Sequence, residues 1–133
     1  IARRIVICAA EDVGLANPNA LVVANAAMQA VHQIGMPEAR IILAEAVCVV
    51  SRSRKSNSAY MAINDALDDV RNIDVGSIPM HIRNAPIEDM KKEGYNVGYK
   101  YPHEYPGGIV KQQYLPNEIK DKTYFKPKDW EVV

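Results

Sequence analysis

The chain has 133 residues, the size of one ordinary domain, and its 16 basic and 16 acidic residues give a formal net charge of zero. A neutral chain has no overall field that would draw it onto nucleic acid or an anionic membrane, so any such contact has to be local. The sequence contains no apolar run of about 18 residues, and its start lacks the basic, apolar and small-residue order of a signal peptide, so we expect neither a membrane-spanning helix nor an export signal in it.

The chain begins at Ile1 without an initiator methionine, so we expect it to be a fragment of a longer protein. Because neither a membrane anchor nor an export signal is evident, we expect that protein to be soluble and cytoplasmic. The two cysteines, Cys8 and Cys48, fall in apolar helical patterns and indicate neither a disulfide scaffold nor a zinc site.

The first part of the chain predicts two helices. Apolar side chains recur at helical spacing over residues 2–15, and Gly14 is expected to bring this helix towards its end. Asn17 is expected to accept a hydrogen bond from the first free amides of the next helix, and Pro18 pre-sets its first turn. The second helix is therefore predicted over 18–34.

Three further helices follow. Pro37 opens a segment over 37–52 that is too long for a strand, and Ser56 is expected to cap a fourth helix. A short fifth helix is expected before Gly94, with acidic residues early and basic residues late, as the helix dipole favours. The apolar stripe of the fourth helix consists of Tyr60, Ile63, Leu67 and Val70.

Composition changes after Gly94, since eight of the nine aromatic residues lie beyond it. Such a segment, interrupted by proline and glycine, is typical of loops pinned by aromatic side chains. We therefore predict an all-α fold in a single domain over 1–133. A bundle of about five helices occupies residues 1–94, and an irregular aromatic tail occupies residues 95–133.

The helices predicted over 18–34 and 37–52 are apolar on most of their circumference, and no charged residue lies between Asp12 and Glu38. Either they are the two central helices of a monomer, or neighbouring copies of the chain cover them. The pattern leaves both alternatives open, and the second makes this chain an oligomerisation domain. The candidate interface residues are Leu21, Val22, Met28, Val31, Ile42 and Val49.

The sequence contains few signs of a catalytic site. It contains no Gly-x-x-x-x-Gly-Lys-Ser/Thr phosphate loop, and His32, His81 and His103 share no metal-ligand spacing with each other or with the cysteines. We therefore predict no catalytic residue, no metal and no cofactor in this chain. A small independent enzyme that uses His103 and nearby carboxylates is the least favoured interpretation.

Two local groups of residues are candidates for DNA contacts. Arg52, Arg54 and Lys55 stand among serines at a helix junction, where cations and hydroxyls can meet phosphates. Lys100 and His103 are interleaved with tyrosines that can stack on unpaired bases. The alternatives are a solvated loop for the first group and core or interface tyrosines for the second. A DNA-binding module is therefore the main competitor of an assembly domain.

Several motifs resemble the MgsA/RarA family, the replication-associated recombination proteins A, which are related to the Werner helicase interacting protein. The longest is Gly94-Tyr-Asn-Val-Gly-Tyr-Lys-Tyr-Pro-His-Glu-Tyr-Pro-Gly-Gly108, which continues to Gln112-Gln-Tyr-Leu-Pro116. Further upstream, in the family's order, lie Ala10-Glu-Asp-Val-Gly-Leu-Ala16, Ile34-Gly-Met-Pro-Glu38, Lys55-Ser-Asn-Ser-Ala-Tyr60 and Pro79-Met-His-Ile-Arg-Asn-Ala-Pro86. The resemblance covers nearly the whole chain.

The resemblance implies that an AAA ATPase domain, which binds ATP and Mg²⁺, lies upstream of this chain. It also implies a helical fold like the C-terminal domains of clamp loaders, and assembly into a homotetramer. The full-length protein is then expected to act on DNA at stalled replication forks, near the nucleoid and beside single-strand-binding protein. No catalytic residue is carried over, because this chain lacks the ATPase motifs.

Overall fold

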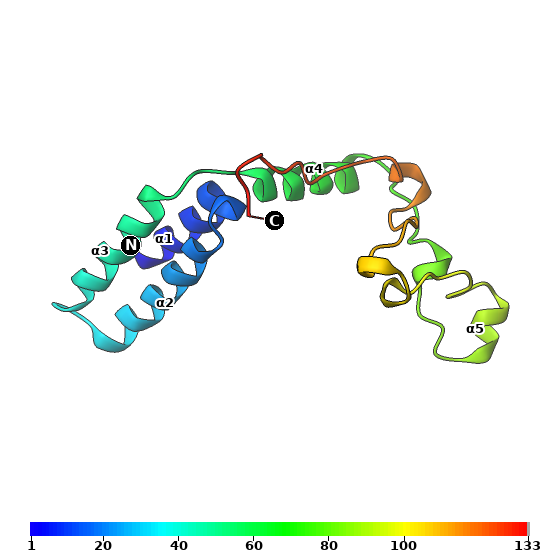
Figure 1. Cartoon of the computed structure of the whole chain (residues 1–133), viewed down its shortest axis with the longest axis horizontal. Coiled ribbons are helices and arrows are strands. Elements are labelled where there is room, and N and C mark those ends of the chain that lie inside the picture. The colour runs from blue at the N-terminus through cyan, green and yellow to red at the C-terminus, as the bar shows by residue number, and fades with distance from the viewer. Residues whose placement is uncertain (133) are drawn as a thin grey trace. The chain divides into compact units, whose positions relative to one another are not determined.

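The structure is a computed structural model that describes residues 1–132. These residues form five α-helices and no β-strand, so the predicted all-α fold is confirmed (Figure 1). The helices are α1 (Ala2–Cys8), α2 (Asn19–Ile34), α3 (Ala39–Arg52), α4 (Ser58–Asn72) and α5 (Glu88–Lys92). None of them has both the length and the apolar character that crossing a bilayer requires.

The chain divides into two compact units. The first unit contains residues 1–67 and the end of the chain from Thr123, and the second contains residues 68–122. The single-domain organisation expected from the sequence stays a prediction.

In the first unit, α1, α2 and α3 pack against one another, and α1 continues through a π-helical turn (Ala9–Val13) and a 3-10 turn (Gly14–Ala16). The helical region predicted over 2–15 is therefore present. The core between these helices is built mostly of alanine, and Val13 is the largest fully buried side chain among the described residues. The buried core residues are Ile5, Ala9, Val13, Ala20, Ala24, Ala27, Ala46 and Val50.

The predicted cap of α2 is wrong. No side chain caps the start of this helix. The Asn17 side chain instead donates its Nδ2 hydrogen bond to Ser53 Oγ at 2.9 Å, and the Ser53 hydroxyl donates to the Val49 carbonyl at 2.7 Å. The Asn17 side chain therefore acts as a donor to the end of α3 and not as an acceptor for the first amides of α2. The bond ties the start of α2 to the end of α3.

α4 begins at Ser58, one residue later than a cap at Ser56 implies, but the Ser56 hydroxyl does accept a hydrogen bond from the amide of Ser58 at 3.2 Å. The apolar stripe predicted on this helix is present, but its side chains are exposed to solvent. The four residues of the stripe are Tyr60, Ile63, Leu67 and Val70.

The second unit holds α5 and several 3-10 turns. The ion pairs Lys91–Glu88 at 3.0 Å and Lys92–Asp89 at 2.7 Å follow the charge order predicted for α5. They are exposed, so each contributes only about 0.2–0.5 kcal/mol. The 3-10 turns that follow are Pro102–Glu104, Pro106–Gly108 and Asn117–Ile119.

Side chains order the turn-rich part of the second unit. The Gln112 amide pairs with the backbone of Lys100, donating from Nε2 to the carbonyl at 2.8 Å and accepting from the amide at Oε1 at 3.1 Å. A ring nitrogen of His81 lies 2.7 Å from the carbonyl oxygen of Gln113. Residues 1–132 form no strand, so these bonds satisfy backbone groups that strand pairing does not satisfy.

Gly14 lies where the end of the α1 region meets the linker between α3 and α4. Its backbone has φ +50, and a Cβ atom added there would lie 2.7 Å from the carbonyl oxygen of Ser56. The amide of Ser56 donates to the carbonyl of Asp12 at 2.9 Å, which holds the two segments together. This contact needs glycine both for its conformation and for its lack of a side chain.

We predict that Gly14→Ala destabilises the protein more than Gly35→Ala, by about 1–3 kcal/mol. Both residues have a positive φ, but an added Cβ at Gly35 meets nothing within 4 Å. Both variants therefore carry the strain of a positive φ at alanine, about 1–3 kcal/mol. Only Gly14→Ala also brings its Cβ atom too close to the Ser56 carbonyl. Urea denaturation followed by circular dichroism measures the difference, and equal destabilisation by the two variants would contradict the close approach.

Candidate assembly surface and nucleic-acid interface

The apolar residues predicted as an interface do not form one continuous face. Leu21 and Val22 are 40% and 64% exposed, whereas Met28, Val31, Ile42 and Val49 are half-buried. Ile42 and Val49 pack partly against the alanine core of their own unit. Leu21 and Val22 line a shallow groove beside Val6, and Met28 and Val31 line another beside Ile1.

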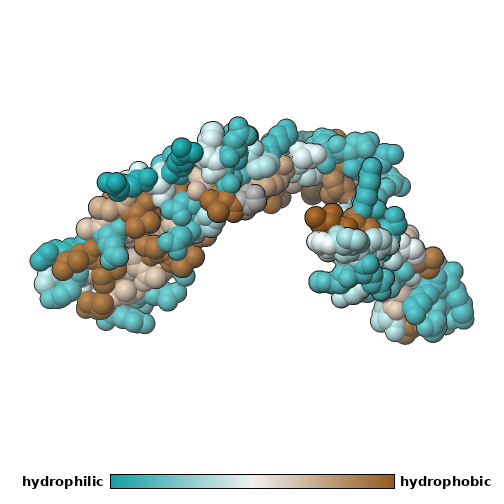
Figure 2. Space-filling model, in the orientation of Figure 1, coloured by the Kyte–Doolittle hydropathy of each residue, from teal (hydrophilic) through white to brown (hydrophobic). Residues whose placement is uncertain are grey.

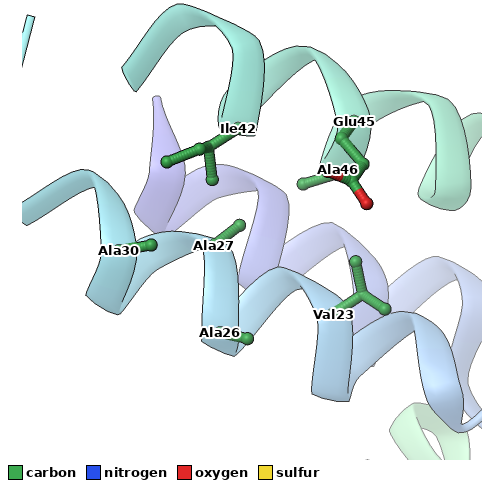
Figure 3. A pocket seen from close by; sticks show the side chains of 7 residues that line it. All are labelled: Val23, Ala26, Ala27, Ala30, Ile42, Glu45 and Ala46. Carbon is green, nitrogen blue, oxygen red and sulfur yellow. The ribbon is translucent and has the colours of Figure 1, made fainter. Parts of the chain in front are cut away.

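A third groove lies between α2 and α3 (Figure 3). Alanines contributed by both helices line much of it, with Val23 and Ile42 as larger apolar residues and Glu45 as the charged one. A lining of alanine leaves room for the ridge of another helix to approach closely. The alanines are Ala26, Ala27, Ala30 and Ala46.

The predicted interface residues did not include Ile41 and Val47 of α3, which are 60% and 47% exposed. The signal that could have found them is the alanine spacing on α2. Buried alanines recur there at positions 20, 24 and 27, which marks the inner face and leaves larger side chains outside. Figure 2 shows hydrophobic surface over the part of the molecule that α1, α2 and α3 form.

The basic residues predicted to contact DNA lie at the end of α3. Arg52, Arg54 and Lys55 are all exposed. Lys55 Nζ donates to the carbonyls of Val50 at 2.7 Å and Ser53 at 3.0 Å. The last carbonyls of a helix carry partial negative charge, so this ammonium group stabilises the end of α3 and is held in place there.

The C-terminal segment, residues 123–132, returns to this linker. Trp130 Nε1 donates to the Lys55 carbonyl at 3.0 Å, and the amide of Val132 donates to the Leu15 carbonyl at 3.0 Å. The hydroxyls of Ser56 and Ser58 both donate to Glu131 Oε1. Nothing in the sequence pattern predicted this contact, which joins positions 75 residues apart.

Two shallow depressions meet at Lys55. Arg54, Lys55 and Trp130 line one of them. The other is lined by Lys55 and Lys128 together with Asp12, Ser56 and Asn57. The C-terminal segment therefore adds an aromatic ring and a further cation to the predicted basic cluster.

The other predicted DNA contacts, Lys100 and His103, belong to the second unit. Lys100 Nζ donates to the Lys111 carbonyl at 3.3 Å, and the His103 ring lies 5.1 Å from the Tyr101 ring, centroid to centroid. Both side chains are thus engaged within their own segment.

Both cysteines are free thiols. A hydrogen bond to Asp12, with Cys8 Sγ 3.1 Å from Asp12 Oδ2, raises the pKa of Cys8, and burial adds to this rise. Cys48 is exposed on α3. Within residues 1–132, no three His, Cys, Asp or Glu side chains are grouped as metal ligands.

Glu131 has a pKa below its ordinary value. Desolvation raises the pKa of this carboxyl, but the hydrogen bonds from Ser56 and Ser58, with smaller contributions from Lys128, lower it by more. A carboxyl whose pKa is lower in the folded protein stabilises the fold above its unfolded pKa. That stabilisation is lost as the pH falls through the folded value, so acid should release the C-terminal segment.

We predict that Glu131→Gln removes this acid transition, because glutamine does not titrate. In the unchanged protein, Trp130 emission should shift to the red as the pH falls below about 4.5, the ordinary pKa of a glutamate. Trp130 is the one tryptophan of the chain, so the emission reports on this contact. Glu38→Gln, an exposed control beyond the far end of α2, should keep the transition. A Glu131→Gln variant with the same acid shift would contradict the assignment.

Comparison with known proteins agrees with the motifs. Residues 1–132 match the family model described as MgsA AAA+ ATPase C terminal. The fold and the match define the class as the C-terminal region of AAA+ ATPases. The chain belongs to the MgsA C-terminal family, and the predicted resemblance is confirmed.

Relatives carry the names expected from that family. The chain is 47% identical over 128 residues to the replication-associated recombination protein A of Bacillus subtilis, covering 96% of this chain and 30% of that protein. It is 38% identical over 131 residues to the protein of the same name in Escherichia coli, covering 96% of this chain and 29% of that protein. It is also 38% identical over 129 residues to the ATPase WRNIP1 of Dictyostelium discoideum, covering 96% and 15%. The chain thus spans less than a third of each of these relatives.

Proposed function

We propose that this chain is the assembly domain of a DNA-acting AAA ATPase and that it joins copies of that protein through the apolar surface of α2 and α3. One observation carries the proposal. The core of the first unit is mostly alanine, and larger apolar side chains lie on its outside. A monomeric helical domain is more stable when its larger apolar side chains are buried, so this arrangement is the opposite of the one expected for a monomer. The exposed residues are Leu21, Val22, Ile41 and Val47.

The energetics support contact between copies. Full burial of a Leu, Ile or Val side chain contributes about 1.5–3 kcal/mol. Because these side chains are already about half buried, roughly half of that remains for each of them. Association costs about 4–15 kcal/mol in lost freedom, so a stable contact needs several such side chains from each copy. The grooves beside α2 offer places for them to insert.

The family resemblance supplies the rest of the proposal. Four copies form a homotetramer, which holds their upstream ATPase domains together, and those domains bind ATP and Mg²⁺. The assembled protein acts on DNA in replication, recombination and repair at stalled forks, beside single-strand-binding protein. The names of the relatives support a role in replication and recombination. This chain contributes assembly and no catalytic residue of its own.

We predict that the chain, which has a mass of 14.8 kDa, forms a tetramer in solution. The double variant Val22→Glu with Ile41→Glu should be a monomer. Both residues are exposed, so the charges should leave the fold intact but oppose burial between copies. Size-exclusion chromatography with light scattering measures the mass, and circular dichroism checks the helices.

The matched control is Val97→Glu, which places the same charge on an exposed valine of the second unit and should leave the mass unchanged. A wild-type chain that is monomeric at micromolar concentration would refute the assembly function. A double variant that remains tetrameric would refute the assignment of the surface.

A second candidate function is DNA binding by this chain itself. The exposed cations Arg52, Arg54 and Lys55 favour it. Within residues 1–132, none of the ion pairs involves any of them, so no acid at contact distance neutralises their charge, although Lys55 Nζ is bonded to two backbone carbonyls. This function uses residues other than the apolar ones of α2 and α3, so the two can be tested separately.

A further inference from the structure

Trp130 occupies an unusual position for a large aromatic residue. It is 43% exposed, yet its indole N–H donates to the Lys55 carbonyl at 3.0 Å. The bond satisfies the ring's polar group and fixes one edge against the linker between α3 and α4. The ring is therefore held in one place, with part of its surface open to solvent.

Cations line the depression that holds this ring and the depression beside it. Arg54 and Lys55 line the same depression as Trp130, and Lys128 lines the adjoining depression with Lys55. Lys55 is held by its bonds to carbonyls at the end of α3. In the described part of the chain, none of the ion pairs involves Arg54 or Lys128.

The carboxylates near this cluster are partly engaged. Glu131 accepts hydrogen bonds from Ser56 and Ser58, and Asp12 Oδ2 lies 3.1 Å from the Cys8 thiol. Asp129 is exposed beside Trp130 in sequence. Arg54 and Lys128 are exposed and form no ion pair at contact distance with any of the described residues, although the charge of Lys128 interacts with that of Glu131.

A fixed, exposed aromatic ring beside cations is the combination that binds single-stranded nucleic acid. An unpaired base stacks on the ring, and the cations contact the phosphates on either side of it. In a duplex the bases are stacked on one another and paired, so none is free to cover a ring in a shallow depression. The same surface therefore discriminates against double-stranded DNA.

We propose that Trp130, Arg54, Lys55 and Lys128 form a binding site for single-stranded nucleic acid, with one base stacked on the indole and the adjacent phosphates held by the cations. The inference rests on the second candidate function, DNA binding by this chain, and it assigns the site and the preferred form of the nucleic acid. It adds two residues, Lys128 and Trp130, that lie far from the basic cluster in sequence.

The tyrosine-rich tail fits this role less well. Tyr101 already stacks at a tilt on the His103 ring, and Lys100 is bonded to the Lys111 carbonyl. Lys55 is bonded to carbonyls in the same way, so the difference lies in the rings. A base would have to displace the Tyr101–His103 contact, whereas none of the ring contacts among residues 1–132 involves Trp130.

The experiment uses Trp130 as its own probe, because the chain has one tryptophan. The whole chain is titrated with an oligothymidylate of about 15 nucleotides, and tryptophan fluorescence is recorded. Stacking of a base should quench the emission. A duplex of the same length should bind at least about tenfold more weakly, and inorganic phosphate at the same phosphate concentration should not quench.

Variants separate stacking from charge. Arg54→Ala and Lys128→Ala should each weaken binding of a dye-labelled oligonucleotide severalfold and reduce the salt dependence, by about 0.7 in the log-log slope for each phosphate that is no longer neutralised. Trp130→Ala should weaken it about tenfold or more, whereas Trp130→Phe, which keeps a ring but lacks the N–H that fixes it, should weaken it less than Trp130→Ala. Lys111→Ala, an exposed lysine of the second unit, is the control and should have no effect.

The outcomes separate the two levels of the inference. No binding to any oligonucleotide would overturn both the site and the second candidate function. Binding that leaves the fluorescence unchanged and is insensitive to Arg54→Ala and Lys128→Ala would overturn the site alone. Equal binding of duplex and single strand would overturn the preference for unpaired bases. Assembly is measured separately by light scattering, so none of these results bears on it.

Discussion

Five of the eight buried core residues of the first unit are alanines, and much of this unit follows from the close packing of α1, α2 and α3 that they allow. Helices that meet across alanine lie near one another and have little space between them for larger side chains. Leucine, isoleucine and valine are therefore displaced outward, as Leu21, Val22 and Ile41 show. The same choice of residues gives the unit its small core and its apolar exterior, and the exterior is what an assembly domain requires.

The linker between α3 and α4 organises the remainder of that unit. Asn17 bonds to Ser53, the amide of Ser56 bonds to Asp12, and Glu131 accepts from the serines at the start of α4. Gly14 permits the closest of these approaches. As a result, the end of the chain is bound beside the basic cluster, where it places Trp130 next to Arg54.

Local signals predicted the helices well and long-range contacts poorly. The helix predicted over 18–34 is found as Asn19–Ile34, because its periodicity and its Pro and Gly boundaries all lie within the segment itself. The cap at Asn17 was wrong because a serine 36 positions away binds that side chain. Likewise, Arg54 and Lys55 stand out because they are adjacent, whereas Trp130 reaches them only through the fold. The periodicity of apolar residues treats alanine and the larger apolar residues alike, so it did not predict that the core would consist mostly of alanine.

The separation of small inner residues from larger outer ones has a consequence for evolution and for protein engineering. Buried positions such as Ala20 and Ala24 determine how closely the helices pack, whereas Val22 and Ile41 are exposed and do not take part in that packing. Side chains on the exterior can therefore change in matched pairs while the scaffold stays the same. If copies assemble through this surface as proposed, complementary charges or shapes placed there would give subunits that bind only a chosen partner.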